Sequence, residues 1–339
     1  MKHLLETLYV LTPESYLFHR NENVCISVGG QEKASIPAAQ VDAIVMFGKN
    51  TFSTSLLGFC GRNGITVTFL DQFGQFEGTL CGPVSGNVLL RKRQYEQLDS
   101  PDFTREFVCD LLLSKIQNSK LVLMRHARIG KGDGAALSSA AEKLSELAAG
   151  IAACTDVDSM RGLEGVAASV YFAAFDEMLA SPQSFRFIRR SKRPPKNEVN
   201  AVLSFLYTQL AHDVRAALET VGLDPAAGFL HTLRPGRASL ALDLMEELRA
   251  PLCDRMALAL FNRGQLTHAD FEYVTPAVYL NEKGRRTVLS QWRVRKKDEL
   301  THPFLQEKIS VGMIPYTQAM LLARVLRGDL DRYPPFVWR

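Results

Sequence analysis

GPVSGNVLLRKRQY, residues 82–95, divides the chain into two parts with different patterns of hydrophobic residues. Before this stretch, short apolar runs rich in Val, Ile, Thr and Phe alternate with Gly, Asn and Asp, which predicts short strands joined by turns. From Asn87 onward, apolar residues recur at the spacing of helices. The sequence therefore predicts an α+β fold, with a small N-terminal β-rich domain at residues 1–85 and a larger all-α C-terminal domain at residues 86–339.

Composition limits the class of protein without naming its function. The chain has 339 residues, 46% hydrophobic and 22% charged, as in ordinary globular proteins. Residues 1–90 hold 5 of the 40 Lys and Arg and 7 of the 36 Asp and Glu, so the basic excess lies later in the chain. Such an excess permits nucleic-acid binding. Six cysteines without a CxxC pair, no signal peptide and no long apolar run lead us to expect a soluble cytoplasmic protein with reduced thiols.

Glu164 is the first candidate site residue. It stands among small and apolar residues in RGLEGVAASVYFAAF, which begins at Arg161. Phe172 and Phe175 follow at helical spacing, so we expect Glu164 to border the core. Burial of a lone carboxylate is costly, which predicts a charged partner or a metal ion. A glutamate on a solvated helix surface is the alternative.

A second group of candidates lies in GFLHTLRPGRASLALDLMEELRAPLCDR, which begins at Gly228. His231 precedes a turn, and a helix is expected to start shortly after it. Asp243 and Glu246 are three residues apart and share a helix face. Asp254 is three helical turns beyond Asp243 and is expected to project from the same face. A solvated acidic face beside an ordinary histidine is the alternative.

Together the two strings predict a divalent-metal site formed by Glu164, His231 and a second acid. Mg²⁺ and Mn²⁺ prefer oxygen ligands, and Mn²⁺ also accepts an imidazole. A metal held in this way can polarise a phosphodiester and activate a hydroxyl. The spacing alone does not name the reaction, because similar triads also serve hydrolases that do not act on DNA.

Basic residues near these strings are candidates for DNA contacts. The loop SFRFIRRSKRPPK, residues 184–196, carries Arg189, Arg190 and Arg193, which can follow a phosphate backbone. A solvated charged loop is the alternative. Two further arginines lie one helical turn from candidate ligands and can hold a phosphate or form structural ion pairs; they are Arg161, before Glu164, and Arg249, after Glu246.

These strings resemble the CRISPR-associated protein one family, the integrase of spacer acquisition, over nearly the whole chain. The finer likeness is to the version found in type I-C systems. The residues that carry the resemblance are DAIVMFG, GITVTFLD, LLRKRQY, LEGVAASVYF, RPPKNEVNAVLSFLYTQL, GFLHTLRPGRASLALDLMEELRAPLCDR and YLNEKGRRTVL.

The resemblance implies a helical catalytic C-terminal domain and a homodimer. It also implies assembly with a small ferredoxin-like partner, the second CRISPR adaptation protein, on double-stranded and branched DNA. The implied reaction is a metal-dependent transesterification with Mg²⁺ or Mn²⁺, in which the 3′-hydroxyl of a captured fragment attacks a phosphodiester at a repeat boundary.

Residue by residue, the resemblance implies that Glu164 and His231 are metal ligands. Glu246 matches a third ligand that is Asp in some members, and Asp243 matches a supporting acid, so either of the two acids remains open as the third ligand. Two other functions stay open at this point: a metal-dependent nuclease on branched DNA and a non-catalytic DNA-binding scaffold. A helical metallohydrolase for small molecules is a weaker alternative.

Overall fold

The computed structural model describes residues 6–71, 76–80, 82, 88–130, 132–180 and 185–338. The chain separates into two compact units, Met1–Ser85 and Gly86–Arg339. The first is β-rich and the second mostly helical, which confirms the predicted fold class. No helix in the described ranges combines the length and hydropathy that a membrane span requires.

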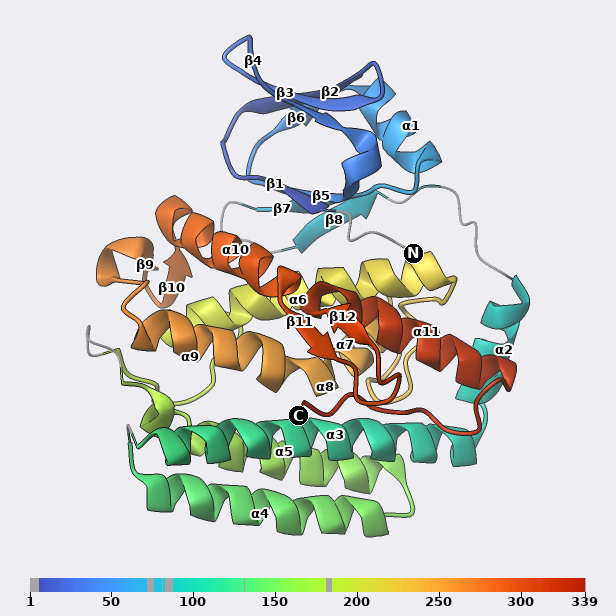
Figure 1. Ribbon diagram of the computed structural model, residues 1–339, viewed down its shortest axis with the longest axis vertical. Helices are drawn as coiled ribbons and strands as arrows, with labels where there is room; N and C mark the ends of the chain where they lie inside the picture. The colour runs from blue at the N-terminus through green and yellow to red at the C-terminus, as the bar shows by residue number, and fades with distance from the viewer. Residues whose placement is uncertain are drawn as a thin grey trace. The chain divides into compact units, whose positions relative to one another are not determined.

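Two four-stranded sheets make up the N-terminal unit (Figure 1). One has the order β1-β5-β7-β8, and the other has the order β4-β3-β2-β6. Leu17 of β2, Ile44 of β5 and Val67 of β7 are all buried in one hydrophobic cluster, to which Leu56 of α1 also belongs. The elements are β1 (Glu6–Val10), β2 (Ser15–Arg20), β3 (Asn23–Val28), β4 (Gln31–Pro37), β5 (Val41–Phe47), β6 (Thr51–Phe52), α1 (Thr54–Arg62), β7 (Thr66–Leu70) and β8 (Phe76–Leu80).

Helices form most of the C-terminal unit, but this unit is not all-α as expected, because it also contains two short antiparallel hairpins, β9-β10 and β11-β12. The hairpin strands have three or four residues each, too short for a clear alternating pattern in the sequence. The elements are α2 (Val88–Leu98), α3 (Pro101–Ile129), α4 (Gly134–Ala153), α5 (Val157–Ala173), α6 (Glu198–Val221), α7 (Ser239–Leu244), α8 (Glu246–Leu248), α9 (Arg255–Asn262), β9 (Phe271–Val274), β10 (Ala277–Leu280), α10 (Glu282–Lys297), β11 (Glu299–Thr301), β12 (Lys308–Ser310) and α11 (Ile314–Arg327).

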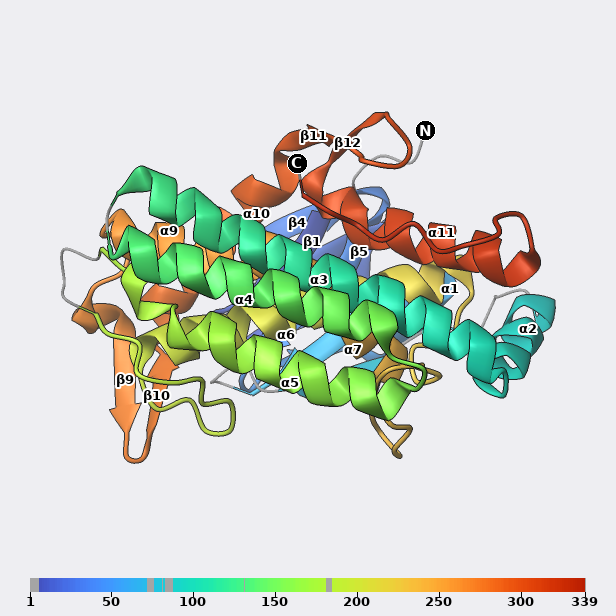
Figure 2. The same ribbon diagram turned by 90° about the horizontal axis from the view of Figure 1, so that it is seen from below.

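Helix α3 is the long helix on which the site is built. Ser100 caps its start by accepting a hydrogen bond from the backbone N–H of Phe103, and Gly130 ends it in the left-handed conformation that glycine adopts without strain. Helices α3, α4 and α5 pack side by side (Figure 2). The opposite side of α3 contacts α8, so α3 lies between α5 and α8 and its side chains can reach both.

The C-terminal tail after α11 runs back to α3 and is held beside α8 by hydrogen bonds. The amide of Asn118, on α3, donates hydrogen bonds to the carbonyls of Glu247 (2.7 Å) and Phe336 (2.8 Å). The Glu247 carboxylate accepts from the backbone N–H of Phe336 (2.7 Å) and the hydroxyl of Tyr333 (2.7 Å). Burial raises the pKa of Glu247 to about 7, although these hydrogen bonds oppose the shift. The tail therefore holds the residue that follows Glu246.

Candidate active site

Asp243 of α7 organises the loop that carries His231. Its fully buried carboxylate accepts hydrogen bonds from the backbone N–H groups of Phe229 (2.6 Å), Leu230 (2.9 Å) and His231 (2.9 Å). Gly228 permits this close approach, because a Cβ atom there would lie 2.7 Å from Asp243 Oδ2 and 2.5 Å from the Ser239 carbonyl carbon. With a fourth contact from the His231 ring, the two oxygens of Asp243 are thus occupied by the loop.

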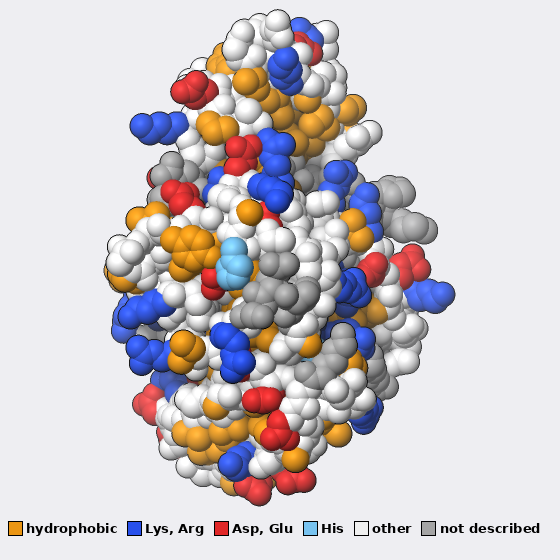
Figure 3. Space-filling view, turned by 90° about the vertical axis from the view of Figure 1, so that its left-hand side faces the viewer, with side chains coloured by type: hydrophobic (Ala, Val, Ile, Leu, Met, Phe, Trp, Pro, Cys, Tyr) orange, Lys and Arg blue, Asp and Glu red, His pale blue; other side chains and the backbone are white. Residues whose placement is uncertain are grey.

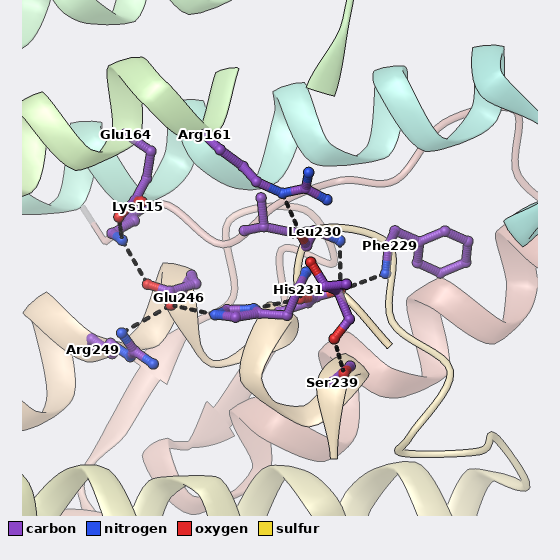
Figure 4. A network of polar contacts seen from close by, with 11 residues as sticks. Lys115, Arg161, Glu164, Phe229, Leu230, His231, Ser239, Glu246 and Arg249 are labelled. Carbon is purple, nitrogen blue, oxygen red and sulfur yellow. Dashed lines mark hydrogen bonds and ion pairs between the residues drawn. The ribbon is translucent and has the colours of Figure 1, made fainter. Parts of the chain in front are cut away.

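The same carboxylate fixes the orientation of the His231 ring. His231 Nδ1 lies 2.7 Å from Asp243 Oδ1, and because a carboxylate can only accept, the Nδ1–H group donates this hydrogen bond. Asp243 does not contact the other ring nitrogen, Nε2, which points towards Glu246 Oε1 at 3.9 Å (Figure 4). A carboxylate that holds the second nitrogen of an imidazole in this way is typical of histidine ligands to metals.

Glu246, at the start of α8, is 4% exposed and surrounded by positive charge. Its Oε1 pairs with Arg249 at 2.8 Å, and its Oε2 pairs with Lys115 at 2.7 Å. Burial alone raises the pKa of this carboxyl, but Arg249, Lys115 and His231 outweigh burial and lower the pKa to about 2. Glu246 is therefore an anion at neutral pH, as a metal ligand must be.

Glu164, on α5, joins this network through Lys115. The Lys115 ammonium forms ion pairs with both Glu164 and Glu246 (Figure 4). Burial lowers the pKa of Lys115, but the two glutamates raise it above its ordinary value, so the side chain stays charged. Sequence reasoning missed Lys115. The sequence held one sign of it, a single lysine in the otherwise largely apolar run LLLSKI, residues 111–116.

Asp254 does not join the site, which corrects the expectation that it shares a face with Asp243. Arg249–Asp254 is a π-helical segment, whose wider turn shifts the angular position of every later residue. Asp254 instead accepts hydrogen bonds from the hydroxyls of Tyr171 (3.0 Å) and Tyr207 (2.7 Å). Burial raises the pKa of Asp254 to about 6, against the effect of these hydroxyls.

The predicted DNA-contacting arginines fall into three environments. Arg161 donates to the Leu230 carbonyl (2.7 Å), and Arg249 pairs with Glu246, so both lie within the site. Arg190 turns inward and donates to Asn200 Oδ1 at 2.8 Å, and burial lowers its pKa. Arg189 and Arg193 are exposed. Figure 3 shows Lys and Arg side chains spread over one face of the molecule among acidic and hydrophobic ones.

A cavity of about 610 Å³, including its open mouth, borders the acids of the site. Glu164, Glu246 and Lys115 line one part of it, and Tyr171 and Tyr207 line another. Arginines and aromatic rings beside two carboxylates offer contacts for a nucleotide's phosphate and base. The lining of the cavity is therefore chemically suited to contact a phosphate group at its mouth.

The donor set fits a divalent metal ion, but the present spacing does not. Glu164, Glu246 and the Nε2 of His231 supply two anionic oxygen groups and one imidazole, which suits Mn²⁺ and Mg²⁺. Among the described residues, however, no three His, Cys, Asp or Glu side chains surround one point at metal-ligand distances. The Lys115 ammonium lies between the two glutamates, so ligation requires it to move.

Comparison with known proteins identifies the family. Residues 8–294 match the model of the family described as CRISPR associated protein Cas1. The chain is 47% identical over 347 residues to the CRISPR-associated endonuclease Cas1 2 of Rhodospirillum rubrum, with 100% of both chains covered.

Solved structures share the fold at lower identity. The Cas6-RT-Cas1–Cas2 complex matches with a TM-score of 0.84 at 23% identity, over 100% of this chain and 36% of that one. A casposase bound to an integration product matches with a TM-score of 0.83 at 19% identity, over 97% and 92% of the two chains. From the family match and the full-length relative, we conclude that the chain belongs to the CRISPR associated protein Cas1 family.

Proposed function

We propose that this chain is a metal-dependent DNA integrase of CRISPR adaptation, which inserts captured DNA fragments as spacers. The single observation that carries the proposal is the orientation of His231 by Asp243, which turns Nε2 towards Glu246. An ionised glutamate and an oriented imidazole beside a cavity lined with cations suit phosphodiester chemistry. The Rhodospirillum rubrum relative is named an endonuclease, which supports action on phosphodiesters.

We assign Glu164, His231 and Glu246 as the ligands of Mg²⁺ or Mn²⁺. Asp243 is a positioning residue, because its oxygens are occupied by the His231 loop. This choice favours Glu246 over Asp243 as the third ligand. A bound metal ion supplies Lewis acidity, which stabilises charge on the phosphate and lowers the pKa of the attacking hydroxyl.

The proposed reaction exchanges one phosphodiester for another. The 3′-oxygen of the fragment forms a bond to phosphorus at the repeat boundary, and the bond from that phosphorus to the 3′-oxygen of the repeat strand breaks. The departing oxygen takes up a proton, and the attacking hydroxyl loses one. Arg249 and Arg161 lie where a guanidinium can hold the phosphate while the bonds change.

We further propose that Arg189, Arg190 and Arg193 belong to the DNA-binding surface. Exposed Arg189 and Arg193 suit direct phosphate contacts, whereas Arg190 supports the loop from inside through Asn200. The proposed partners are a second copy of this chain and the small ferredoxin-like second adaptation protein, in a type I-C system. One chain of the Cas6-RT-Cas1–Cas2 complex has the fold of this chain, and that complex contains Cas2, which is compatible with this assembly.

A nuclease acting on branched DNA is the second candidate, because the endonuclease name of the relative fits it equally well. A labelled fragment with free 3′-hydroxyls, a supercoiled plasmid with a CRISPR array, Mn²⁺ and the partner protein separate the two candidates. We expect labelled fragment joined to the plasmid, and a loss of at least about 100-fold in Glu164→Gln and His231→Ala. Nicking without joining would instead establish the nuclease.

The control for this assay is Glu142→Gln, at an exposed position on α4. It should join DNA at the wild-type rate, because it removes one surface charge without touching the network. Equal joining by Glu164→Gln and wild type would refute the site assignment. Unchanged DNA binding without any joining or nicking would indicate a scaffold.

A further inference from the structure

We propose that Lys115 is the resident cation of the active site: its ammonium holds Glu164 and Glu246 together until a divalent metal ion displaces it. This inference rests on the proposed metal-dependent function and deepens it. It makes Lys115 a positioning residue that sets the affinity of the site for metal ions.

The geometry places one ammonium between two carboxylates from different elements. Lys115 projects from α3, Glu164 from α5 and Glu246 from α8 (Figure 4). The lysine side chain is only 16% exposed, and its Nζ lies 2.7 Å from Glu246 Oε2 while it also pairs with Glu164. Among the described residues, Lys115 is the one cation that forms ion pairs with both acids.

Charge explains why a cation is needed at this point. The Glu246 carboxylate is buried and that of Glu164 is partly buried, so the two repel each other more strongly here than they would in water. Arg249 neutralises Glu246 from the Oε1 side and leaves Oε2 to the lysine. Removal of the ammonium would therefore leave Glu164 and Glu246 facing each other with one counter-charge missing.

The ammonium and a metal ion compete for the same oxygens. A divalent ion requires carboxylate oxygens at about 2.0–2.2 Å and repels another cation a few ångströms away. Metal binding is thus an exchange of cations, and part of its free energy is consumed in breaking the Lys115 pairs. After the exchange, the flexible side chain can turn into the cavity that it already lines.

Titration of Mn²⁺ into the full chain, followed by electron paramagnetic resonance, tests the exchange directly. We expect Lys115→Met to bind Mn²⁺ at least about tenfold more tightly than wild type, because no ammonium has to leave. Its melting temperature should be lower than that of wild type without metal and should rise more when Mn²⁺ is added. Lys115→Arg keeps the charge and should bind like wild type.

Two variants separate failure of this inference from failure of the proposed function. Lys120→Met removes a lysine on another side of α3 and should leave the Mn²⁺ affinity unchanged. Glu164→Gln should lose Mn²⁺ binding. If Glu164→Gln loses binding but Lys115→Met binds no more tightly than wild type, the lysine inference is wrong and the metal site stands. If Glu164→Gln binds like wild type, the metal site and the inference are both wrong.

A labelling measurement on the unmodified chain covers the case in which Lys115→Met does not fold. Reductive methylation followed by mass spectrometry reports how accessible each lysine amine is. We expect Mn²⁺ to increase methylation of Lys115 several-fold relative to Lys120, because the displaced amine leaves its ion pairs. An unchanged ratio at saturating Mn²⁺ would overturn the inference.

Discussion

The Asp243 carboxylate binds His231 twice, through the ring Nδ1 at 2.7 Å and through the backbone N–H at 2.9 Å. One carboxylate thus sets both the path of the loop and the tautomer of the imidazole. The Nε2 atom can reach Glu246 only because Asp243 controls the other side of the ring.

Asp243→Asn tests this control with little change in side-chain shape. The amide NH₂ group that replaces one oxygen cannot accept hydrogen bonds from the N–H donors around it. If it faces the ring, it favours the tautomer of His231 with the proton on Nε2. We expect the Mn²⁺ affinity to fall by about 10–100-fold, as for other residues that orient metal ligands. Calorimetric titration measures the affinity, and exposed Asp329→Asn is the control. An affinity within twofold of wild type would contradict the proposed role.

Gly228→Ala tests whether the His231 loop needs a glycine in order to pack closely against α7. The new Cβ would lie 2.7 Å from Asp243 Oδ2 and 2.6 Å from the Leu240 backbone nitrogen. We expect the free energy of unfolding to fall by about 1–3 kcal/mol, because the loop must shift away from α7. Urea denaturation measures the loss. Gly162→Ala on α5 meets nothing within 4 Å and should be neutral or slightly stabilising; equal effects of the two changes would contradict the steric argument.

In the basic loop, residues 184–196, we expect some arginines to contact DNA and one to stabilise the folded loop. Arg189→Ala with Arg193→Ala removes two exposed charges and should lower the slope of log affinity against log salt by up to about 2, with little change in melting temperature. Arg190→Ala should instead lower the melting temperature, because Arg190 donates to Asn200 and lies over the Tyr207 ring. Fluorescence anisotropy at several salt concentrations gives the slope. An unchanged slope in the double variant would remove the loop from the DNA-binding surface.

Asp254 should make stability depend on pH in acid solution. Its pKa is about 6 in the folded chain, against an ordinary value of 3.8, because burial favours the neutral acid. The folded state therefore binds this proton more tightly than the unfolded state does. The resulting stabilisation is complete below pH 4, falls as the pH rises to about 6, and is absent above it. The amount is on the order of a few kcal/mol.

The pH effect is measured as a difference between two proteins. Asp254→Asn keeps an oxygen that can accept from Tyr171 or Tyr207, but it cannot titrate. The free energy of unfolding of wild type minus that of the variant should fall between pH 4 and pH 6. A flat difference would show that Asp254 has an ordinary pKa in the folded chain.

The fold class could be predicted from the sequence because the spacing of apolar residues that distinguishes strands from helices is a property of neighbouring residues. Helical periodicity after residue 87 is set by residues a few positions apart in the sequence. The charged partner of Glu164 was also foreseeable, since a carboxylate at the border of an apolar core needs a partner.

The remaining features of the site depend on contacts between distant segments. Lys115 meets Glu164 and Glu246 only because α3 packs between α5 and α8, and no spacing in the sequence records that packing. Asp254 was misplaced because the π-helical segment before it changes the helix phase. No motif in the sequence of this segment distinguishes a π-helical turn from an ordinary α-helical turn.

The fastening of the C-terminal tail has a consequence for synthesis on the ribosome. Asn118 precedes its partner Phe336 by 218 residues, and the same Asn118 amide holds the peptide group between Glu247 and Leu248. While the chain is being translated, α3 emerges long before the residue that locks it to α8. The Glu247 carboxylate therefore lacks the hydrogen bonds from Tyr333 and Phe336 until those residues have left the ribosome, so a translation product truncated before Tyr333 would leave this buried acid without either donor.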